Sequence, residues 1–470
     1  MAKTIETQLV VVGGGPGGYP AAFMAADHGL KVTLVDMEDN PGGVCLYRGC
    51  IPSKALLHMA SLLNEVKEAE SCGVSFGKPK IDVGQLRAWK DSVVQRLTGG
   101  LGQLGKQRKV DFVKGRARFT DATSLVVTTD DGDVTVSFEQ AILATGSRPA
   151  MIPFADGVKG VMDSTGALAL EDIPKTLLVI GGGYIGLELG QAYAAFGSDV
   201  TVVEMLPDLL ANADRDLVQV LEKRLKEQFK EILAETKVAG LKNEGSHVVV
   251  SLESKDGKAL KRTFDKVLIS VGRRPNTADL GLEEIGIAVT DKGFVEVDPQ
   301  RRTAVNHIFA IGDVAGEPML AHKATAEARV AVEAMRGLKS IFDPAAIPGV
   351  VFTDPEIAWC GLTEHEAKSQ GVDVKVSKFP WAASGRATTL GRNDGLTKVI
   401  ADAATERILG MGIAGPGAGE MIAEGVLAIE MGAVAEDLAL TIHAHPTLSE
   451  TVMEAAEGIS GQAVHFARKR

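Results

Sequence analysis

Cysteine is scarce in this chain, and its first residues show no leader segment. Only four cysteines occur among 470 residues, which excludes the disulfide-stapled scaffold of small secreted domains. The opening run, MAKTIETQLVVVGGG, leads directly into an expected strand and lacks the basic, apolar and small-residue regions of a signal peptide. We therefore expect a cytoplasmic protein.

Positive charge is also in deficit. With 50 Lys and Arg against 61 Asp and Glu, the formal net charge is -11, so the chain lacks the basic face that nucleic-acid binding needs. One run, residues 177–197, passes a crude hydropathy filter for a membrane span. It contains Glu188 and six glycines, and it is better explained as a buried strand, turn and helix. We expect neither a nucleic-acid partner nor a membrane span.

Glycine, in contrast, is abundant, with 53 residues, and it marks two matched segments. Residues 8–36 predict an apolar strand, a GxGxxG turn, an Ala-rich helix and a second strand that ends in an acid. Residues 176–204 repeat this plan, with each glycine and the acid 168 residues after its counterpart. The first set is Gly13, Gly15, Gly18 and Asp36, and the second is Gly181, Gly183, Gly186 and Glu204.

Such a unit is suited to binding a dinucleotide. Its glycines permit a tight turn, close approach of the backbone to pyrophosphate, and close packing of helix on strand. The helix N-terminus favours the phosphates, and the acid accepts hydrogen bonds from a ribose. Glycine turns needed only for packing are the alternative. Glu204 would repel a 2′-phosphate, and no Arg or Lys follows it in residues 205–210, so we expect NAD rather than NADP at the second site.

Two of the cysteines, Cys45 and Cys50, lie in the run GGVCLYRGCIPSK just after the first unit. In a regular helix, residues at this spacing are about 7.5 Å apart along the axis, beyond the ~4.4–6.8 Å that a disulfide allows between Cα atoms. The segment must therefore bend, which Gly49 and Pro52 permit. A strained pair is easily reduced, and a thiolate near a new helix N-terminus has a lowered pKa. The run predicts a redox-active disulfide.

The C-terminal run IHAHPTLSE places His445 five residues before Glu450. An imidazole whose tautomer is held by a carboxylate is suited to act as a general base. A structural histidine near a helix start is the alternative. The HxH pair also suggests a metal, but no cysteine lies nearby and no further ligands have the right spacing, so we expect no metal site.

These motifs together resemble the pyridine nucleotide-disulfide oxidoreductases, and within them the branch that oxidises dihydrolipoyl groups. The resemblance rests on GGxCxxxxGCIPSK, two GxGxxG units, ATG, an internal GD and HAHPTLSE, and it covers essentially the whole chain. It implies an α/β fold with two Rossmann-like dinucleotide-binding domains, a central domain and a C-terminal α+β dimerisation domain. The expected boundaries are 1–149 for FAD, 150–275 for NAD, 276–346 for the central domain that completes the FAD site, and 347–470 for the interface domain of a homodimer.

The resemblance also implies which residues hold the cofactors. Glu188 is implied as the partner of Lys54 near the nicotinamide. For FAD the residues are Gly13, Gly15, Gly18, Asp36, Lys54, Gly115, Thr145, Gly146, Asp313 and Ala321. For NAD they are Gly181, Gly183, Gly186, Glu188, Glu204, Val238 and Gly272.

The implied reaction oxidises protein-bound dihydrolipoyl groups and reduces NAD⁺. His445 of the partner subunit, oriented by Glu450, removes a proton from the dithiol, whose thiolate attacks Cys45. Cys50 lies nearer the flavin. The implied partners are lipoyl-bearing proteins of 2-oxo acid dehydrogenase or glycine cleavage type complexes.

One departure and three alternatives remain. Tyr47-Arg48 stands where the family more commonly has Asn-Val.

A glutathione-reductase-like enzyme typically uses NADPH, which Glu204 disfavours, and a mercuric or thioredoxin reductase would need a C-terminal cysteine pair beyond Cys360. A flavoprotein subunit without catalysis is disfavoured because every catalytic residue type is present.

Overall fold

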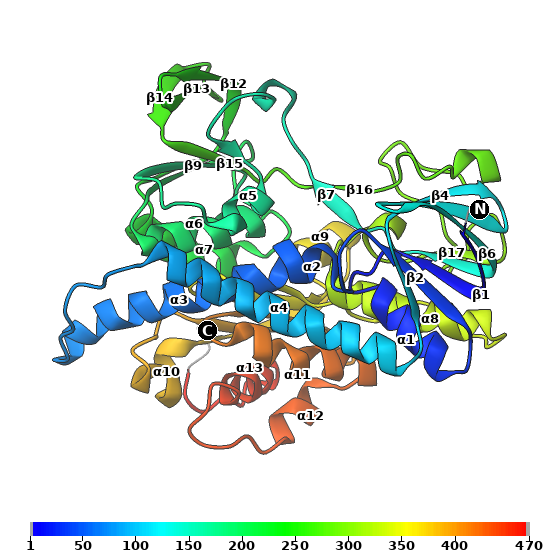
Figure 1. Cartoon of the computed structure of the whole chain (residues 1–470). Helices are drawn as coiled ribbons and strands as arrows, with labels where there is room; N and C mark the ends of the chain where they lie inside the picture. The colour runs from blue at the N-terminus through cyan, green and yellow to red at the C-terminus, as the bar shows by residue number, and fades with distance from the viewer. Residues whose placement is uncertain (1–2, 467–470) are drawn as a thin grey trace.

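The computed structural model describes residues 3–466 (Figure 1). Its first sheet has parallel strands in the order β3-β2-β1-β6, and a β-meander continues from β6 through β5 to β4. β17 pairs with the C-terminal end of β6, on the side away from β1 and beyond β5, so a strand from the central part of the chain extends this sheet. The strands are β1 (Lys3–Val12), β2 (Val32–Asp36), β3 (Asp111–Lys114), β4 (Arg116–Asp121), β5 (Ser124–Thr129), β6 (Gly132–Leu143) and β17 (Ile308–Ala310).

Two helices, α1 and α8, pack their apolar sides on this sheet. Leu9 and Val11 of β1 pack in one buried cluster with Ala21, Ala25 and Ala328, small residues that let α1 and α8 lie close to the strand. α3 instead buries Leu56 and Ala60 in the core of the second unit. The helices are α1 (Gly18–Asp27), α2 (Gly43–Arg48), α3 (Cys50–Glu68), η1 (Ala69–Cys72), α4 (Val83–Gln107), η3 (Glu283–Ile285), η4 (Gly312–Ala315) and α8 (Ala321–Met335).

The second sheet repeats the plan, with parallel strands in the order β11-β10-β9-β15-β8. A three-stranded antiparallel meander, β12-β13-β14, stands beyond it (Figure 1). The strands are β8 (Val161–Met162), β9 (Thr176–Ile180), β10 (Asp199–Val203), β11 (Glu231–Leu233), β12 (Thr236–Glu244), β13 (His247–Ser254), β14 (Ala259–Phe264) and β15 (Lys266–Ile269). The helices are η2 (Pro153–Ala155), α5 (Ser164–Ala169), α6 (Tyr184–Phe196) and α7 (Arg215–Gln228).

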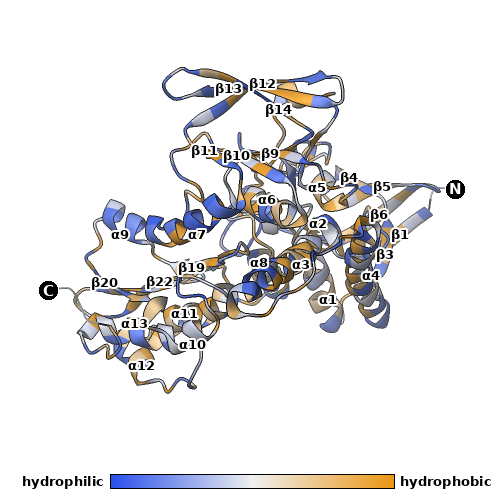
Figure 2. Ribbon diagram, turned by 90° about the vertical axis from the view of Figure 1, so that its left-hand side faces the viewer, coloured by the Kyte–Doolittle hydropathy of each residue, from blue (hydrophilic) through white to orange (hydrophobic). Residues whose placement is uncertain are grey.

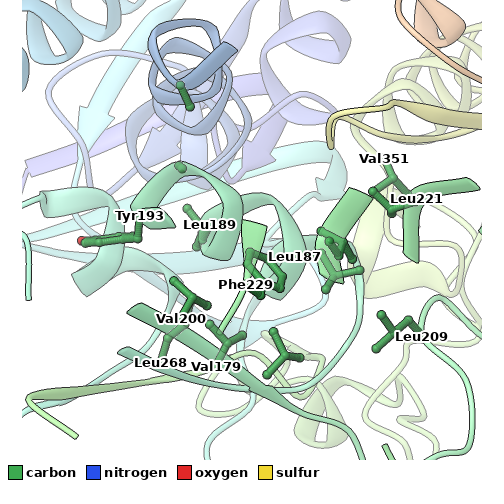
Figure 3. Packing of buried hydrophobic residues seen from close by; sticks show 14 of the residues in the cluster. Val179, Leu187, Leu189, Tyr193, Val200, Leu209, Leu221, Phe229, Leu268 and Val351 are labelled. Atoms are coloured by element: carbon green, nitrogen blue, oxygen red, sulfur yellow. The ribbon is translucent and has the colours of Figure 1, made fainter. Parts of the chain in front are cut away.

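The apolar run at 177–197 is therefore strand, turn and helix, as predicted. Within residues 3–466, no helix combines the length and the apolar character that crossing a membrane requires. Figure 3 shows Leu187 and Leu189 of α6 packed over Val179 and Leu268 of the sheet, and these residues belong to one buried cluster. Val351 belongs to the same cluster, so the core of the second unit continues into the C-terminal part of the chain.

The two units are joined by a two-stranded ribbon that runs between them in Figure 1. It pairs β7 (Ser147–Pro149) with β16 (Arg273–Pro275), the turns that end corresponding strands of the two units. The corresponding segments 141–149 and 267–275 of the two units thus contact each other directly.

The C-terminal part is an antiparallel sheet in the order β18-β19-β22-β21-β20, with helices packed against it. Figure 2 shows hydrophilic residues along much of α7 and α9, consistent with helices that bury one side only. The strands are β18 (Gly349–Val351), β19 (Ile357–Gly361), β20 (Val374–Pro380), β21 (Leu396–Asp402) and β22 (Ile408–Ala414). The helices are α9 (Glu364–Gln370), η5 (Trp381–Ala383), α10 (Gly385–Thr389), α11 (Ala418–Met431), α12 (Ala435–Leu440) and α13 (Glu450–Ser460).

The fold class is thus the predicted one, an α/β protein with two Rossmann-like units and a C-terminal α+β unit. We keep 1–149, 150–275, 276–346 and 347–470 as proposed domain boundaries. The pairing of β17 with β6 supports a central segment that completes the first unit.

Candidate active site

The first glycine turn leaves room for a ligand at its middle position. A Cβ atom on Gly13 would lie 2.2 Å from the carbonyl oxygen of Ala144, and one on Gly18 would lie 1.7 Å from that of Gly13. A Cβ on Gly15 would meet only the Cα of Gly43, at 3.9 Å. The outer glycines are therefore required by protein packing, and the middle one faces free space.

The second turn has the same arrangement. Cβ atoms on Gly181 and Gly186 would lie 2.4 Å and 2.3 Å from backbone oxygens, whereas a Cβ on Gly183 would have no neighbour within 4 Å. Packing alone does not explain a glycine at that middle position, which is where pyrophosphate approaches the backbone. Both turns fit a dinucleotide.

The acids that end the two units are held against these turns in the same way. Asp36 accepts hydrogen bonds from the amides of Gly14 and Glu38, and Glu204 accepts from the amides of Gly182 (2.6 Å) and Leu206 (2.7 Å). Burial raises the pKa of Asp36, and the amide hydrogen bonds only partly offset that rise. Both carboxylates lie where an adenosine ribose would meet the turn.

One cavity brings most of the predicted FAD residues together with both thiols. Tyr184 and Glu188 of α6 line it too, so the second unit forms part of its wall. The predicted residues that line it are Gly13, Gly15, Asp36, Cys45, Cys50, Lys54, Thr145, Gly146, Asp313 and Ala321.

Several residues predicted to bind FAD or NAD do not line this cavity. Gly18 packs on Gly13, as described above, and Gly115 donates its amide to the Asp36 carbonyl oxygen at 2.8 Å. A Cβ on Gly115 would lie 2.5 Å from a backbone oxygen of β5, so packing explains this glycine. Of the residues expected to bind NAD, Val238 packs in the core between the second sheet and its meander, and Gly272 has a φ of +115° with free space beside it.

The chain bends between the two thiols where the sequence predicts it. α2 ends at Arg48, Gly49 has φ −142° and ψ −112°, and α3 begins at Cys50. A Cβ on Gly49 would lie 2.8 Å from the Val44 carbonyl oxygen, so the tight bend itself favours glycine. The two sulfurs are free thiols here, and Cys45 hydrogen-bonds to Cys50.

This contact makes the two thiols unequal. The hydrogen bond from Cys45 lowers the pKa of Cys50 to about 7, with burial opposing and the charge of Lys54 contributing. The same hydrogen bond, followed by burial, raises the pKa of Cys45. The negative charge of the reduced pair therefore resides on Cys50.

Lys54 connects the thiol segment to two other parts of the molecule. Its Nζ lies 2.7 Å from Oε2 of Glu188 and 4.4 Å from the centre of the Phe352 ring. The Phe352 amide donates to Oε1 of Glu188 at 3.0 Å. The ion pair expected from the resemblance is present, although no sequence signal pointed to Phe352.

Tyr47 and Arg48, the unusual pair between the thiols, both reach the segment after β2. The Tyr47 hydroxyl accepts a hydrogen bond from the Asn40 amide (3.2 Å) and donates one to its carbonyl oxygen (3.1 Å), and Arg48 forms an ion pair with Glu38. Glu38 and Arg48 line the cavity next to Asp36. The pair thus ties the thiol helix to the loop that follows Asp36.

Asp313 is held in place across the ribbon that joins the two units. Its Oδ2 accepts a hydrogen bond from the Ser147 hydroxyl, which in turn accepts one from Nε of Arg273 at 2.7 Å. Ser147, Arg273 and Tyr184 are cavity residues that sequence reasoning missed. Tyr184 directly follows the second glycine turn, which was a usable signal, and burial raises its pKa to about 12.

The predicted hydrogen bond between His445, the expected general base, and Glu450 is also formed. Nδ1 of His445 lies 2.9 Å from Oε1 of Glu450, and the other carboxylate oxygen accepts from the Thr447 amide at 2.8 Å. Burial raises the pKa of Glu450, but the hydrogen bonds from Thr447 and His445 outweigh it, so the pKa is lowered overall. The His445 side chain is 78% exposed and does not line the thiol cavity of its own chain.

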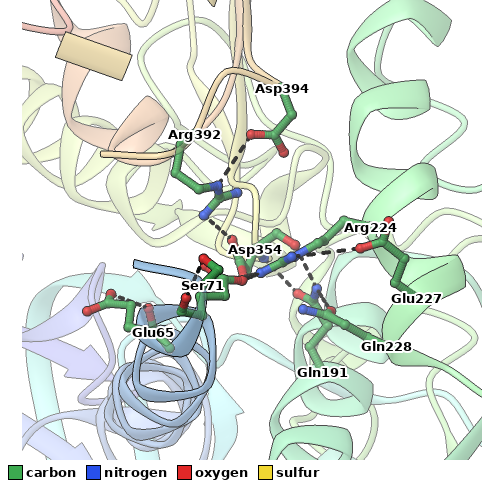
Figure 4. Close-up of polar contacts among 11 residues, drawn as sticks. Glu65, Ser71, Gln191, Arg224, Glu227, Gln228, Asp354, Arg392 and Asp394 are labelled. Carbon is green, nitrogen blue, oxygen red and sulfur yellow. Dashed lines mark hydrogen bonds and ion pairs between the residues drawn. The ribbon is translucent and has the colours of Figure 1, made fainter. Parts of the chain in front are cut away.

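Lys54 also lines a second cleft, in addition to the cavity that contains the thiols. Figure 4 shows the polar network in this cleft, where Asp354 lies between Arg224 and Arg392. Gln191 of α6 contacts the backbone of Asp354. These contacts join the first unit, the second unit and the C-terminal part of the chain.

Two dinucleotide units that share one cavity with an unequal thiol pair define a dinucleotide-dependent disulfide oxidoreductase. The family described as "Pyridine nucleotide-disulphide oxidoreductase" matches residues 7–328, and its dimerisation domain matches residues 347–456. The chain belongs to this family. It is therefore an oxidoreductase of the type that uses FAD and NAD.

Curated relatives are similar over nearly the whole chain. Dihydrolipoyl dehydrogenase of Haemophilus influenzae is 49% identical over 463 residues, which cover 98% of this chain and 96% of the relative. The Vibrio cholerae enzyme of the same name is 47% identical over 462 residues, with 98% and 97% covered. The Geobacillus stearothermophilus enzyme is 48% identical over 465 residues, with 99% and 98% covered.

Solved structures are similar as well. LpdA from Mycobacterium tuberculosis matches with a TM-score of 0.89 at 28% identity, covering 96% of this chain and 99% of that one. The HOCl-induced flavoprotein disulfide reductase RclA from Escherichia coli matches with a TM-score of 0.86 at 30% identity, with 96% and 99% covered.

Proposed function

We propose that this chain is a dihydrolipoyl dehydrogenase, which oxidises protein-bound dihydrolipoyl groups to lipoyl groups and reduces NAD⁺ to NADH. The observation that carries the proposal is the Cys45–Cys50 pair at a helix break, in the wall of a cavity shared by both dinucleotide units. The full-length similarity to dihydrolipoyl dehydrogenases supports this substrate.

The difference in pKa between the two thiols indicates which sulfur is attacked and which one leaves during disulfide exchange. One substrate thiolate attacks Sγ of Cys45 in the oxidised pair, the Cys45–Cys50 bond breaks, and Cys50 leaves as a thiolate. Cys50 is the better leaving group because its pKa is the lower one. The second substrate thiolate then displaces Cys45 from the mixed disulfide, which yields the lipoyl disulfide and the reduced pair. FAD held by the lining of the thiol cavity would supply the redox chemistry that connects the reduced pair to NAD⁺.

His445 of the partner subunit takes one proton of the substrate dithiol, and the other ends on Cys45 after its displacement, because the pKa of Cys45 is raised. Glu450 accepts the hydrogen bond of Nδ1, so Nε2 is the nitrogen left free to take a proton. Because a lowered pKa keeps Glu450 ionised, it also stabilises the imidazolium that forms.

A homodimer supplies that histidine. The chain carries the family's dimerisation domain, and large apolar side chains are exposed on it near His445. Ile442 is 97% exposed, an exposure that a partner surface would remove. The exposed residues are Leu427, Met431, Leu440 and Ile442. We propose this face as part of the contact between two copies of the chain.

The nicotinamide nucleotide at the second turn is proposed to be NAD. Glu204 lies against Gly182, where a 2′-phosphate would meet a carboxylate. This preference separates the chain from disulfide reductases that use NADPH.

The partners of the reaction are proposed to be the lipoyl-bearing proteins of 2-oxo acid dehydrogenase or glycine cleavage type complexes. We also propose a cytoplasmic location, since four cysteines and no disulfide scaffold suit a reducing compartment.

The test is NADH formation from dihydrolipoamide and NAD⁺ by the purified FAD-loaded protein. We expect turnover that is lost in Cys45→Ser, because the sulfur that receives the attack is then absent. A matched control is Cys360→Ser, which removes a buried thiol of the C-terminal sheet. An enzyme that does not reduce NAD⁺ but reduces glutathione disulfide with NADPH would contradict the proposal.

A further inference from the structure

A short segment of the C-terminal part, Phe352 to Asp354, is held by one face of α6. Glu188 and Gln191 lie three residues apart on this helix, which places them on the same side. Glu188 accepts the Phe352 amide, as described above, and Gln191 binds the Asp354 backbone twice. Its Oε1 accepts the amide at 2.8 Å, and its Nε2 donates to the carbonyl oxygen at 2.9 Å.

The Asp354 side chain fixes the other end of this segment. Its carboxylate lies 2.7 Å from Nη1 of Arg392 and 3.2 Å from Nη2 of Arg224 (Figure 4). Arg224 also pairs with Glu68. All three side chains of the Arg224–Asp354–Arg392 cluster are at least three-quarters buried, so solvent screens these contacts only partly. Asp354 is thereby connected to α7 of the second unit and α3 of the first.

The contacts of Lys54 depend on where this segment lies. Lys54 binds Oε2 of Glu188, whose Oε1 is held by the Phe352 amide, and its ammonium sits over the Phe352 ring. We propose that Gln191 and Asp354 are positioning residues for the Lys54–Glu188 ion pair beside the thiols, acting through the Phe352–Asp354 segment. This inference rests on the proposed role of the thiol pair.

The consequence is electrostatic and concerns Cys50. The groups that act on its sulfur are Cys45 and Lys54, which favour the thiolate, and Glu188, which disfavours it, with Tyr184 nearby on α6. Without the Phe352 amide, the carboxylate of Glu188 is less neutralised and draws Lys54 closer to itself. Both changes destabilise the thiolate.

The test measures alkylation of Cys50 by iodoacetamide across pH 5–9 in the reduced, FAD-loaded enzyme, with peptide mass spectrometry to identify the modified cysteine. The wild-type rate should rise through a midpoint near pH 7, since only the thiolate reacts. In Gln191→Ala and Asp354→Asn we expect the midpoint to move up, so that the rate at pH 7 falls by roughly twofold, the effect of raising a pKa near 7 by about half a unit.

Gln228→Ala is the matched control. Gln228 accepts a hydrogen bond from Nε2 of Gln191 but does not contact the Phe352–Asp354 segment, so its midpoint should equal that of wild type. If Gln191→Ala fails to fold, Asp354→Asn, which keeps the side-chain shape, decides the question. An unchanged midpoint in a folded, FAD-loaded variant would overturn the inference. Dihydrolipoamide turnover by the wild-type enzyme tests the proposed function separately.

Discussion

At the scale of single residues, the chemistry depends on what each polar atom contacts. Cys45 and Cys50 are the same residue type a few positions apart, yet one has a raised pKa and the other a lowered one. A group with a lowered pKa is charged over a wider range, so the Cys50 thiolate persists above about pH 7 and is lost as the pH falls below it. Sequence identified both residues and suggested different roles for them, and the geometry adds the contacts that shift their pKa values in opposite directions.

His445→Gln should lower kcat with dihydrolipoamide by roughly 10²-fold or more, the scale of lost general-base catalysis. The measurement is steady-state NADH formation at saturating NAD⁺. His443→Gln is a suitable control, because His443 is held by Glu424 (2.7 Å) and the Thr441 carbonyl (2.8 Å) in the same loop, without contact to Glu450. Near-normal turnover of His445→Gln would rule out its role as the base.

At the scale of helices and strands, the backbone preferences of single residue types were sufficient to predict most of the structure. The break at Gly49, the strand–turn–helix at 177–197 and the meander with its turn at Gly132 all follow from residue types with known backbone preferences. The matched spacing of the two glycine units has a structural counterpart, because Asp36 and Glu204 each accept the amide of the middle residue of a glycine run.

Contacts between segments that are far apart in the sequence were not indicated by any sequence motif. Phe352 meets Glu188 across 164 residues of sequence, and Asp354 lies between two arginines that no motif connects to it. Gly115 stays a predicted FAD residue, and the structure shows that its amide and Cα also pack against the backbone of Asp36 and β5. Side chains that position other side chains are specified by packing, which a pattern of single residues does not contain.

The glycine turns give a prediction at this scale. Gly186→Ala should destabilise the second unit by about 1–3 kcal/mol, because the added Cβ would lie 2.3 Å from the Gly181 carbonyl oxygen. Gly183→Ala should leave stability unchanged and raise the KM for NAD⁺, since only a bound nucleotide occupies that space. Thermal unfolding and NAD⁺ kinetics of both variants check this, and equal effects of the two substitutions would contradict it.

At the scale of the whole molecule, buried charges hold the parts together. Lys398 of β21 is 1% exposed, and its Nζ lies 2.6–2.8 Å from carboxylates of Asp214, Asp216 and Glu364. These three acids come close enough to hold a metal ion, but the Lys398 ammonium already contacts all three, and Lys378 also pairs with Asp216 and Glu364. The contact fixes the start of α7 on the C-terminal sheet, and the Asp354 cluster fixes its later part.

The His445–Glu450 pair is complete within one chain but lies outside the thiol cavity of that chain. We therefore propose that the site is completed only in the dimer. The dimerisation domain and the exposed apolar face around Ile442 support the proposal that the second chain brings its histidine to the first.

The central claim is that electrons pass from a dihydrolipoyl substrate through Cys45 and Cys50 to NAD⁺. Its most direct test mixes the oxidised, FAD-loaded enzyme with one equivalent of dihydrolipoamide without NAD⁺, traps the thiols with iodoacetamide, and identifies the labelled cysteines by peptide mass spectrometry. We predict that Cys45 and Cys50 become labelled only after substrate is added, and that a parallel untrapped sample forms NADH when NAD⁺ follows. Labelling that does not depend on substrate, or NADH formation in which both cysteines stay unlabelled, would contradict the account.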